Sequence, residues 1–236
     1  MAKDNWRHLY DPNGCEFAVD VSGLPMKIKI SHEDEWDAAR VALERVEEID
    51  GQPDHKSRYN KSLDFHDYIC EVAESIGAEI AVAKYFGIAD FDPRKSRFKR
   101  TADVGSIIEV KWTKYDAGSL IIYDTDRNTD IAILVTGKSP VYTLKGWIPI
   151  FAAKNKKWRR RDQPTYWVDQ YNLHPIENLR RSSHGENTLP MQIEHKVTHH
   201  ASMKDELPLG DKARFVQCLS CGTMAIKDVE IDSVIS

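Results

Sequence analysis

The chain has 236 residues and a formal net charge of −4, with 41% apolar and 30% charged side chains. This length and composition are typical of a globular protein with one large domain, or one domain with an appendage. No apolar run approaches the roughly 20 residues that a membrane-spanning helix needs, and four cysteines are too few for a disulfide scaffold. We therefore expect a cytoplasmic protein without a membrane partner; the sequence does not indicate its oligomeric state.

The N-terminal part is predicted to lead from irregular chain into a helix. Residues 1–25 are rich in Gly, Pro, Asp and Asn, and the alternating residues 26–30 predict a short strand. Ser31 is a candidate N-cap, and Gly51 ends the helix that follows. The apolar stripe of this helix is expected to comprise Trp36, Ala39, Leu43, Val46 and Ile49.

A second helix is predicted from about residue 63 to residue 86, with Gly87 ending it. With about 100° between successive residues, Glu79 falls within about 40° of Phe65 and therefore on the apolar face, whereas Glu74 falls nearly opposite. A carboxylate on a buried face is costly unless it is paired or binds a metal. Glu79 is therefore a candidate site residue. The apolar face consists of Phe65, Ile69, Val72, Ile76, Ile80, Ala83 and Phe86.

The middle of the chain alternates strand and turn signals. Residues 166–179 then predict a strand or turn followed by a short helix. This order is typical of an α+β or α/β fold with a mixed central sheet flanked by helices. The expected organisation is an N-terminal segment (1–60), a core (61–180) and a small C-terminal appendage (181–236). The expected strands of the core lie near 101–104, 107–113, 119–123, 131–136 and 141–150.

The segment DTDRNTD, residues 124–130, has acids and an amide at alternate positions, like the start of a calcium-binding loop. Its sixth position is Thr129, where such a loop needs Gly, and its twelfth is Val135, where it needs Glu. We therefore expect a polar connection between two strands.

Residues 101–114, TADVGSIIEVKWTK, place two acids and a lysine among β-branched and aromatic residues. Alternate residues of a strand share a face, so Glu109 and Lys111 point one way while the apolar residues between them point into the core. Gly105 permits a sharp turn that would fold Asp103 back beside Glu109. Neighbouring carboxylates repel each other unless a cation lies between them, and such oxygen ligands suit Mg²⁺ or Mn²⁺. With the lysine charge nearby, the pattern is typical of phosphoryl chemistry.

The order Asp103, then Glu109-Val110-Lys111, resembles the signature of the PD-(D/E)xK nuclease superfamily: an acid, a turn, and acid-x-Lys on a strand. The run GAEIAVAKYFG followed by ADVG and EVK is similar to small, phage-encoded members of this superfamily. The resemblance covers roughly residues 62–180 and implies a restriction-endonuclease-like core. Two further segments resemble those members, Gly146-Trp147-Ile148 and Trp167 to Leu173.

The resemblance implies Mg²⁺-dependent hydrolysis of DNA phosphodiesters to 5′-phosphate and 3′-hydroxyl ends, in a host cytoplasm if the chain is phage-encoded. It implies that Asp103 and Glu109 bind the metal, with the Val110 carbonyl as a possible further ligand. Glu79 would bind the metal directly or through water. Lys111 would position the attacking water. The expected catalytic residues are therefore Lys111, Glu109, Asp103 and Glu79.

Two basic clusters bracket this constellation. Residues 94–100 hold five Lys and Arg and residues 154–161 hold six, and neither range contains an acid. Such clusters favour binding to the phosphate backbone of DNA without reading its sequence, and Trp158 could stack on a base; solvated loops are the alternative. The expected DNA-binding residues are Lys99, Arg100, Lys156, Lys157, Arg159, Arg160 and Arg161.

The C-terminal extension contains Cys218 and Cys221 in a C-x-x-C pattern, which is half of a zinc site. His195 and His199 could complete four ligands, with His200 as a substitute for one. The alternative is a pair of free thiols in a small hairpin.

Two other interpretations of the whole chain stay open. One is a catalytically inactive DNA-binding protein that uses the basic loops on the same fold. The other is a structural or interaction protein with the C-x-x-C end as a docking module. The sequence does not distinguish endonuclease from exonuclease action or DNA from RNA.

Overall fold

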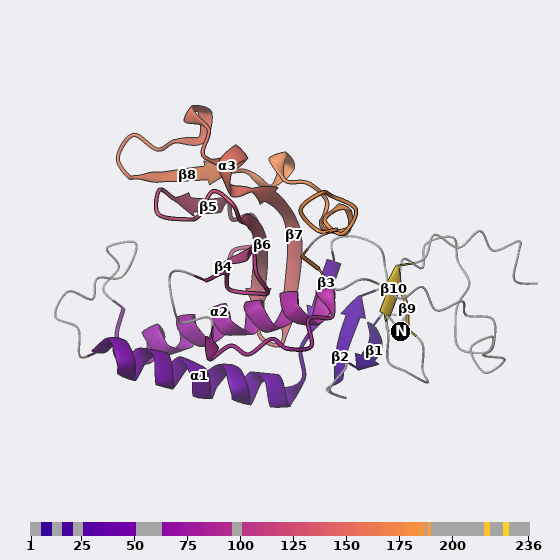
Figure 1. Cartoon of the computed structure of the whole chain (residues 1–236). Helices are drawn as coiled ribbons and strands as arrows, with labels where there is room; N and C mark the ends of the chain where they lie inside the picture. The colour runs from indigo at the N-terminus through magenta and orange to yellow at the C-terminus, as the bar shows by residue number, and fades with distance from the viewer. Residues whose placement is uncertain are drawn as a thin grey trace, which may run out of the picture.

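The computed structural model describes residues 6–10, 16–20, 26–50, 63–95, 101–186, 188–189, 215–217 and 224–226. Helix α1 (His32–Asp50) packs on helix α2 (Phe65–Phe86), and α2 lies between α1 and the main sheet (Figure 1). The fold is therefore a mixed α+β arrangement of layers. None of the described helices is long and apolar enough to cross a membrane.

The main sheet has six strands in the order β1-β2-β3-β7-β6-β4. The last pair, β6 and β4, is parallel and the other pairs are antiparallel, so the sheet is mixed as expected. Strand β4 is terminal among the described strands and has β6 as its only neighbour in the sheet. The bounds are β1 (Trp6–Tyr10), β2 (Glu16–Asp20), β3 (Met26–Lys29), β4 (Ile108–Thr113), β6 (Ile131–Lys138) and β7 (Val141–Pro149).

A second, two-stranded sheet of β5 (Leu120–Tyr123) and β8 (Thr165–Val168) lies on the other side of the main sheet from the helices (Figure 1). Helix α3 (Ile150–Ala153) and the 3₁₀ helix η2 (Lys156–Trp158) connect β7 to β8. One hydrophobic core fills the space between helices and sheet, and a smaller core lies between the sheet and β5–β8. A separate pair is formed by β9 (Phe215–Gln217) and β10 (Met224–Ile226).

The strand predictions are largely confirmed, with three corrections. Residues 1–25 are predicted to be mostly irregular, but β1 pairs there with β2 and β2 pairs with β3, a partner that local composition does not reveal. Residues 101–104 form no strand and contribute a single bridge, Val104 to Ile108. After β8 the chain makes two 3₁₀ turns, η3 (Gln170–Asn172) and η4 (Ile176–Asn178), in place of the expected short helix.

The buried face of α1 differs from the expected one. Ser31 caps the helix as predicted, through a reciprocal bond between its hydroxyl and Asp34. Trp36 and Leu43, however, are each 52% exposed. The periodic pattern allows more than one phase, and the face of α1 that is buried consists of Ala and Val side chains, of which Val46 belongs to the expected stripe. The buried residues are Ala38, Val41, Ala42 and Val46.

The second helix is confirmed from Phe65 to Phe86, and Gly87 ends it in the left-handed conformation. Glu79 is 4% exposed, as its helical phase predicted. Glu74 is not on an outer face: its Oε2 accepts hydrogen bonds from the Tyr142 hydroxyl (2.9 Å) and the Ser139 N–H (2.8 Å). The reason is that the connection between β6 and β7, which contains Ser139, and the start of β7 pack against this side of α2.

The two C-terminal segments that carried part of the family resemblance lie side by side. Trp147 pairs with His174 through two main-chain hydrogen bonds, of 2.9 and 2.8 Å. At Gly146 a Cβ atom would lie 2.6 Å from the His174 carbonyl oxygen, so this contact requires glycine.

Candidate active site

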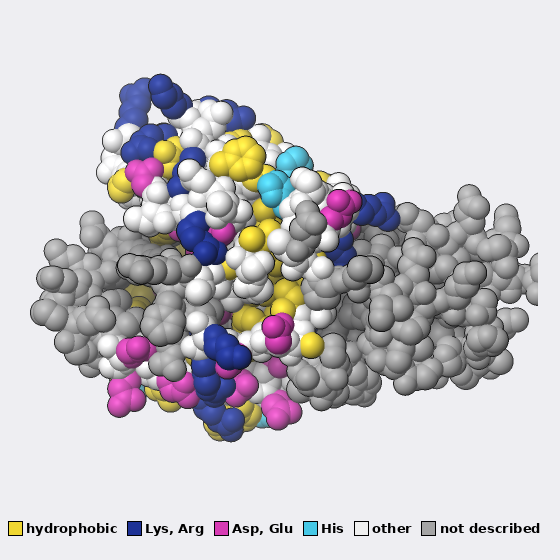
Figure 2. Space-filling model, in the orientation of Figure 1, with side chains coloured by type: hydrophobic (Ala, Val, Ile, Leu, Met, Phe, Trp, Pro, Cys, Tyr) yellow, Lys and Arg dark blue, Asp and Glu magenta, His cyan; other side chains and the backbone are white. Residues whose placement is uncertain are grey.

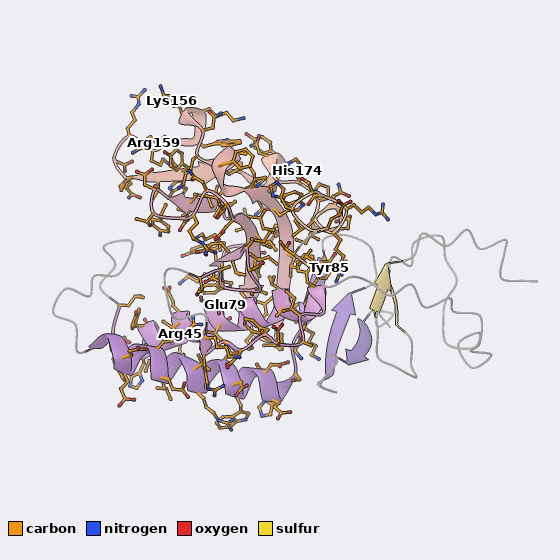
Figure 3. The ribbon with its side chains drawn as sticks, in the orientation of Figure 1. Arg45, Glu79, Tyr85, Lys156, Arg159 and His174 are labelled. Carbon is orange, nitrogen blue, oxygen red and sulfur yellow. The ribbon has the colours of Figure 1, made fainter. Side chains whose placement is uncertain are left out.

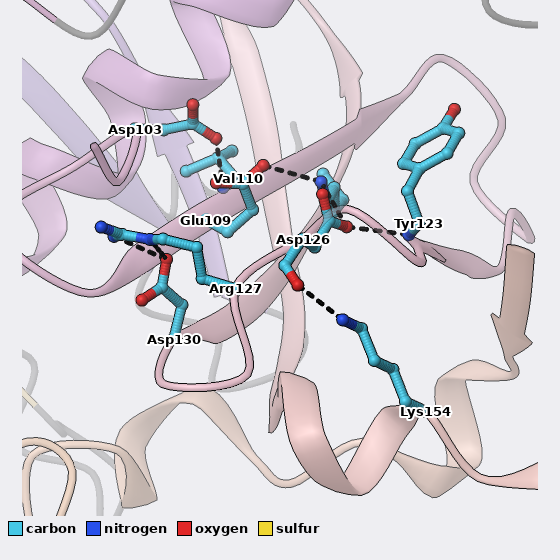
Figure 4. A network of polar contacts seen from close by, with 9 residues as sticks. Asp103, Glu109, Val110, Tyr123, Asp126, Arg127, Asp130 and Lys154 are labelled. Atoms are coloured by element: carbon cyan, nitrogen blue, oxygen red, sulfur yellow. Dashed lines mark hydrogen bonds and ion pairs between the residues drawn. The ribbon is translucent and has the colours of Figure 1, made fainter. Parts of the chain in front are cut away.

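A tight turn brings Asp103 back onto β4. Val104 and Ile108 exchange two main-chain hydrogen bonds, of 3.0 and 3.2 Å, around Gly105, whose φ of 60° favours glycine. One carboxylate oxygen of Asp103 then accepts a 2.8 Å hydrogen bond from the Val110 N–H (Figure 4). The turn expected at Gly105 is confirmed, and Asp103 lies at the edge of β4 that has no strand partner among the described residues.

The two faces of β4 meet different surroundings. Ile108, Val110 and Trp112 pack with the core beneath α2, as the alternation predicted. Glu109 and Lys111 point to the other face, toward the segment that links β5 to β6. The ammonium Nζ of Lys111 lies 2.7 Å from Glu109 Oε1 and 3.0 Å from Asp126 Oδ2 (Figure 4).

Lys111 carries its proton at neutral pH. Burial disfavours the ammonium and by itself would lower the pKa, but the charges of Glu109 and Asp126 and the hydrogen bonds to them outweigh it, so the pKa of Lys111 is raised. The side chain is therefore a hydrogen-bond donor and a fixed positive charge, and not a base.

Asp103 is the least compensated acid of the group. Burial, followed by the charges of Glu79 and Glu109, raises its pKa well above the ordinary value, while the Val110 N–H and Lys111 act in the opposite direction. A cation near Asp103 would relieve this repulsion.

Glu79 reaches this group from the helix side. Both of its oxygens accept from the Arg45 guanidinium, at 3.2 and 3.0 Å, and Arg45 also donates to the Pro93 carbonyl at 2.8 Å (Figure 3). Since α2 packs beneath the apolar face of β4, Glu79 and Lys111 lie on opposite sides of the strand. The charge of Glu79 nevertheless acts on Asp103 at the strand edge.

Arg45 and Asp126 were both missed by the sequence reasoning. Arg45 lies on α1, 34 residues before its partner Glu79. The only feature of the sequence that could have indicated its role is its position next to the buried residues of α1. Asp126 lies in the segment expected to be a plain polar connection, where nothing in the pattern ties it to Lys111.

The donor chemistry of the site fits a hard divalent cation. Four carboxylates, of Glu79, Asp103, Glu109 and Asp126, face the two cations Arg45 and Lys111, which leaves two formal negative charges in excess. The described residues do not, however, include any group of three or more His, Cys, Asp or Glu placed to hold a metal ion. The charge of Glu109 acts on Asp103, whereas Glu79 is paired with Arg45.

The second basic cluster forms an ordered loop beside β8. Lys156, Lys157, Arg160 and Arg161 are exposed, and basic side chains gather at this end of the molecule (Figure 2). Arg159 is exposed too, but it binds both oxygens of Asp124, at 3.1 and 3.0 Å, and donates to the Tyr166 hydroxyl. Arg159 therefore anchors the loop to the segment after β5.

Trp158 is partly buried against the smaller core, with Lys157 Nζ 3.9 Å from its ring centroid. Much of the Trp158 ring is therefore in contact with the protein. Lys99 and Arg100, the remaining DNA-binding predictions, lie outside the described residues. The zinc ligand predictions, Cys218, Cys221, His195 and His199, lie outside them as well.

Comparison with family models, with curated proteins and with solved structures finds no match to this chain.

Proposed function

We propose that the protein is a metal-dependent deoxyribonuclease, built on a restriction-endonuclease-like core, that hydrolyses phosphodiester bonds. The observation that supports this proposal is that Asp103 is held on β4 where the charges of Glu109 and Lys111 both act on its carboxyl group, in a cluster where carboxylates outnumber cations. Excess buried carboxylate charge beside a fixed ammonium is typical of functional sites and is costly in a purely structural role.

Asp103 and Glu109 would hold Mg²⁺ or Mn²⁺, with the Val110 carbonyl as the further oxygen ligand. The bound ion would polarise the phosphate and lower the pKa of water. Lys111 remains an ammonium, so its part is to donate a hydrogen bond and place positive charge beside the phosphate or the attacking water. Glu79, fixed by Arg45, adds negative charge that acts on Asp103 from the helix side.

The exposed loop of Lys156, Lys157, Arg160 and Arg161 would bind the phosphate backbone. It is joined to the site through one segment, because Asp124 holds Arg159 of the loop and Asp126 holds Lys111. DNA bound along the loop would therefore lie next to the segment that contacts the lysine.

The proposal is tested by Mg²⁺-dependent cleavage of linear and circular DNA by the wild type and by Lys111→Met. We expect the variant to lose about 10²–10³-fold in kcat, because a preorganised charge at the reacting phosphate is removed. Lys138→Ala, at an exposed lysine outside both basic clusters, is the control and should cleave like the wild type. Thermal melting checks that the variant is folded, and equal cleavage by folded wild type and folded Lys111→Met would dismiss the proposed site.

A second candidate is a DNA-binding protein of the same fold without turnover. It is favoured by the pairing of Glu79 with Arg45 and of Lys111 with two acids, which leaves no preformed group of three metal ligands among the described residues. Salt-sensitive DNA binding with no cleavage under Mg²⁺ or Mn²⁺ would support this candidate.

Both candidates predict that the basic loop binds DNA. Changing its four exposed cations to Ala should make the slope of the logarithm of the binding constant against the logarithm of the salt concentration less steep by about 3–4. Each phosphate contact contributes about 0.9 to the magnitude of this slope. The control removes the same charge outside both basic clusters, at the exposed Lys29, Arg40, Lys138 and Arg181. Similar slopes for the two quadruple variants would show that net charge, and not the loop, governs binding; the measurement is a fluorescence-anisotropy titration without divalent cations.

A further inference from the structure

Asp126 is an acid that no motif singled out, yet it makes one of the two closest contacts of Lys111. Its Oδ2 lies 3.0 Å from the Lys111 ammonium, and both side chains are only 11% exposed. It enters from the segment between β5 and β6, whereas the other partner, Glu109, comes from the lysine's own strand. The ammonium is therefore held between two separate elements of the fold.

The orientation of Asp126 is built into the main chain. The Tyr123 N–H donates to its Oδ2 at 2.9 Å, and its own N–H donates to the Tyr123 carbonyl at 3.1 Å. Lys154, just after α3, donates to the main-chain carbonyl of Asp126 (Figure 4) and also to that of Asp124. These contacts fix the turn and leave the carboxylate directed at Lys111.

A lysine with one carboxylate partner keeps much of the freedom of its four-carbon stem, because an ammonium is a point charge with rotatable donors. A second carboxylate from another element limits the ammonium to a single place, which is what a catalytic charge requires before substrate arrives. Glu109 alone cannot meet this need if it also serves as a metal ligand.

We propose that Asp126 is a positioning residue that fixes the Lys111 ammonium between the β5–β6 segment and β4. Its catalytic consequence rests on the proposed nuclease function; the positioning itself does not. Asp126→Asn is the informative variant. An amide oxygen in the place of Oδ2 can still accept from the Tyr123 N–H and from Lys111, and the main-chain contacts with Lys154 stay, so that the change removes only the negative charge that faces the Lys111 ammonium.

The first test needs neither metal nor DNA. The folded wild type and Asp126→Asn are treated briefly with an amine-acylating reagent, and modification of each lysine is measured by peptide mass spectrometry. We expect Lys111 to react severalfold faster in the variant, with Lys154 unchanged as the internal reference. Unchanged labelling of Lys111 would overturn the proposal, and so would faster labelling of both lysines, which would show that the whole segment has loosened.

The second test is a double-mutant cycle in DNA cleavage. Asp126→Asn should lower kcat by about 10- to 100-fold through misplacement of the lysine, with DNA affinity in the absence of metal unchanged. In a Lys111→Met background the same change should have no further effect, because Asp126 acts only through the lysine. An equal loss in both backgrounds would overturn this role.

Two controls separate the possible failures. Asp90→Asn, the same change at an exposed acid, should alter neither labelling nor cleavage. Asp126→Glu keeps the charge and should recover part of the lost rate. If the wild type cleaves no DNA, the nuclease proposal fails while the labelling experiment still decides whether Asp126 holds Lys111.

Discussion

Two groups of buried charge in this protein are balanced in different ways. In the helix layer two acids each have a cation of their own: Glu79 pairs with Arg45 at 3.0 Å, and Asp34 pairs with Lys84 at 3.3 Å. On the outer face of β4 two acids share Lys111, and Asp103 at the strand edge has an additional uncompensated charge. The first arrangement supports packing of α1 on α2, whereas the second carries repulsion that a bound cation would relieve.

The largest effect that would test this difference is expected on the free energy of unfolding when Arg45 is replaced. Arg45→Ala removes both hydrogen bonds to Glu79 and leaves a carboxylate buried without its cation. We expect a loss of about 3–5 kcal/mol in the free energy of unfolding, measured by urea denaturation. Arg40→Ala, at an exposed arginine of the same helix, should cost about 0.5 kcal/mol or less. A loss at Arg45 as small as that at Arg40 would remove the distinction between the two groups.

A smaller effect, of opposite sign, is expected at Asp103. Its pKa is raised in the folded protein, so the folded state holds the proton more tightly than the unfolded chain. The stabilisation that protonated Asp103 contributes is therefore fully present at pH below the ordinary carboxyl pKa of about 4, and it is lost as the pH rises through the pKa of the folded state. Asp103→Asn keeps an acceptor for the Val110 N–H but removes this dependence.

We expect Asp103→Asn to be more stable than the wild type at pH 8, with the difference vanishing toward pH 4. The measurement is the free energy of unfolding in urea across that range, with Asp90→Asn as a control that should show no such trend. A variant less stable than the wild type at pH 8 would mean that a cation in the protein already balances Asp103.

Local patterns predicted the parts of this site that lie close together in sequence. Alternation along β4 gave the common direction of Glu109 and Lys111, and the turn at Gly105 returned Asp103 to them. Helical phase placed Glu79 on a buried face. These features depend on periods of two and 3.6 residues, which a single sequence displays.

The remaining features depend on which elements pack together. Arg45 meets Glu79 because α1 lies on α2, and Asp126 meets Lys111 because the β5–β6 segment crosses the face of β4. Packing between elements also explains why Trp36 is exposed although the helical pattern predicts it to be buried. A helix with apolar residues at several phases buries the face that best fits its neighbour, and on α1 this is the face with the small residues.

The bond between Asp103 and the Val110 N–H has a consequence for self-association. A terminal strand with unoccupied N–H and C=O groups is a template on which another chain can add a strand and begin to aggregate. Here a side chain already occupies one of those N–H groups, and the turn that carries it folds over the start of β4. The Asp103 carboxylate thus removes one of the main-chain donors to which an added strand would pair.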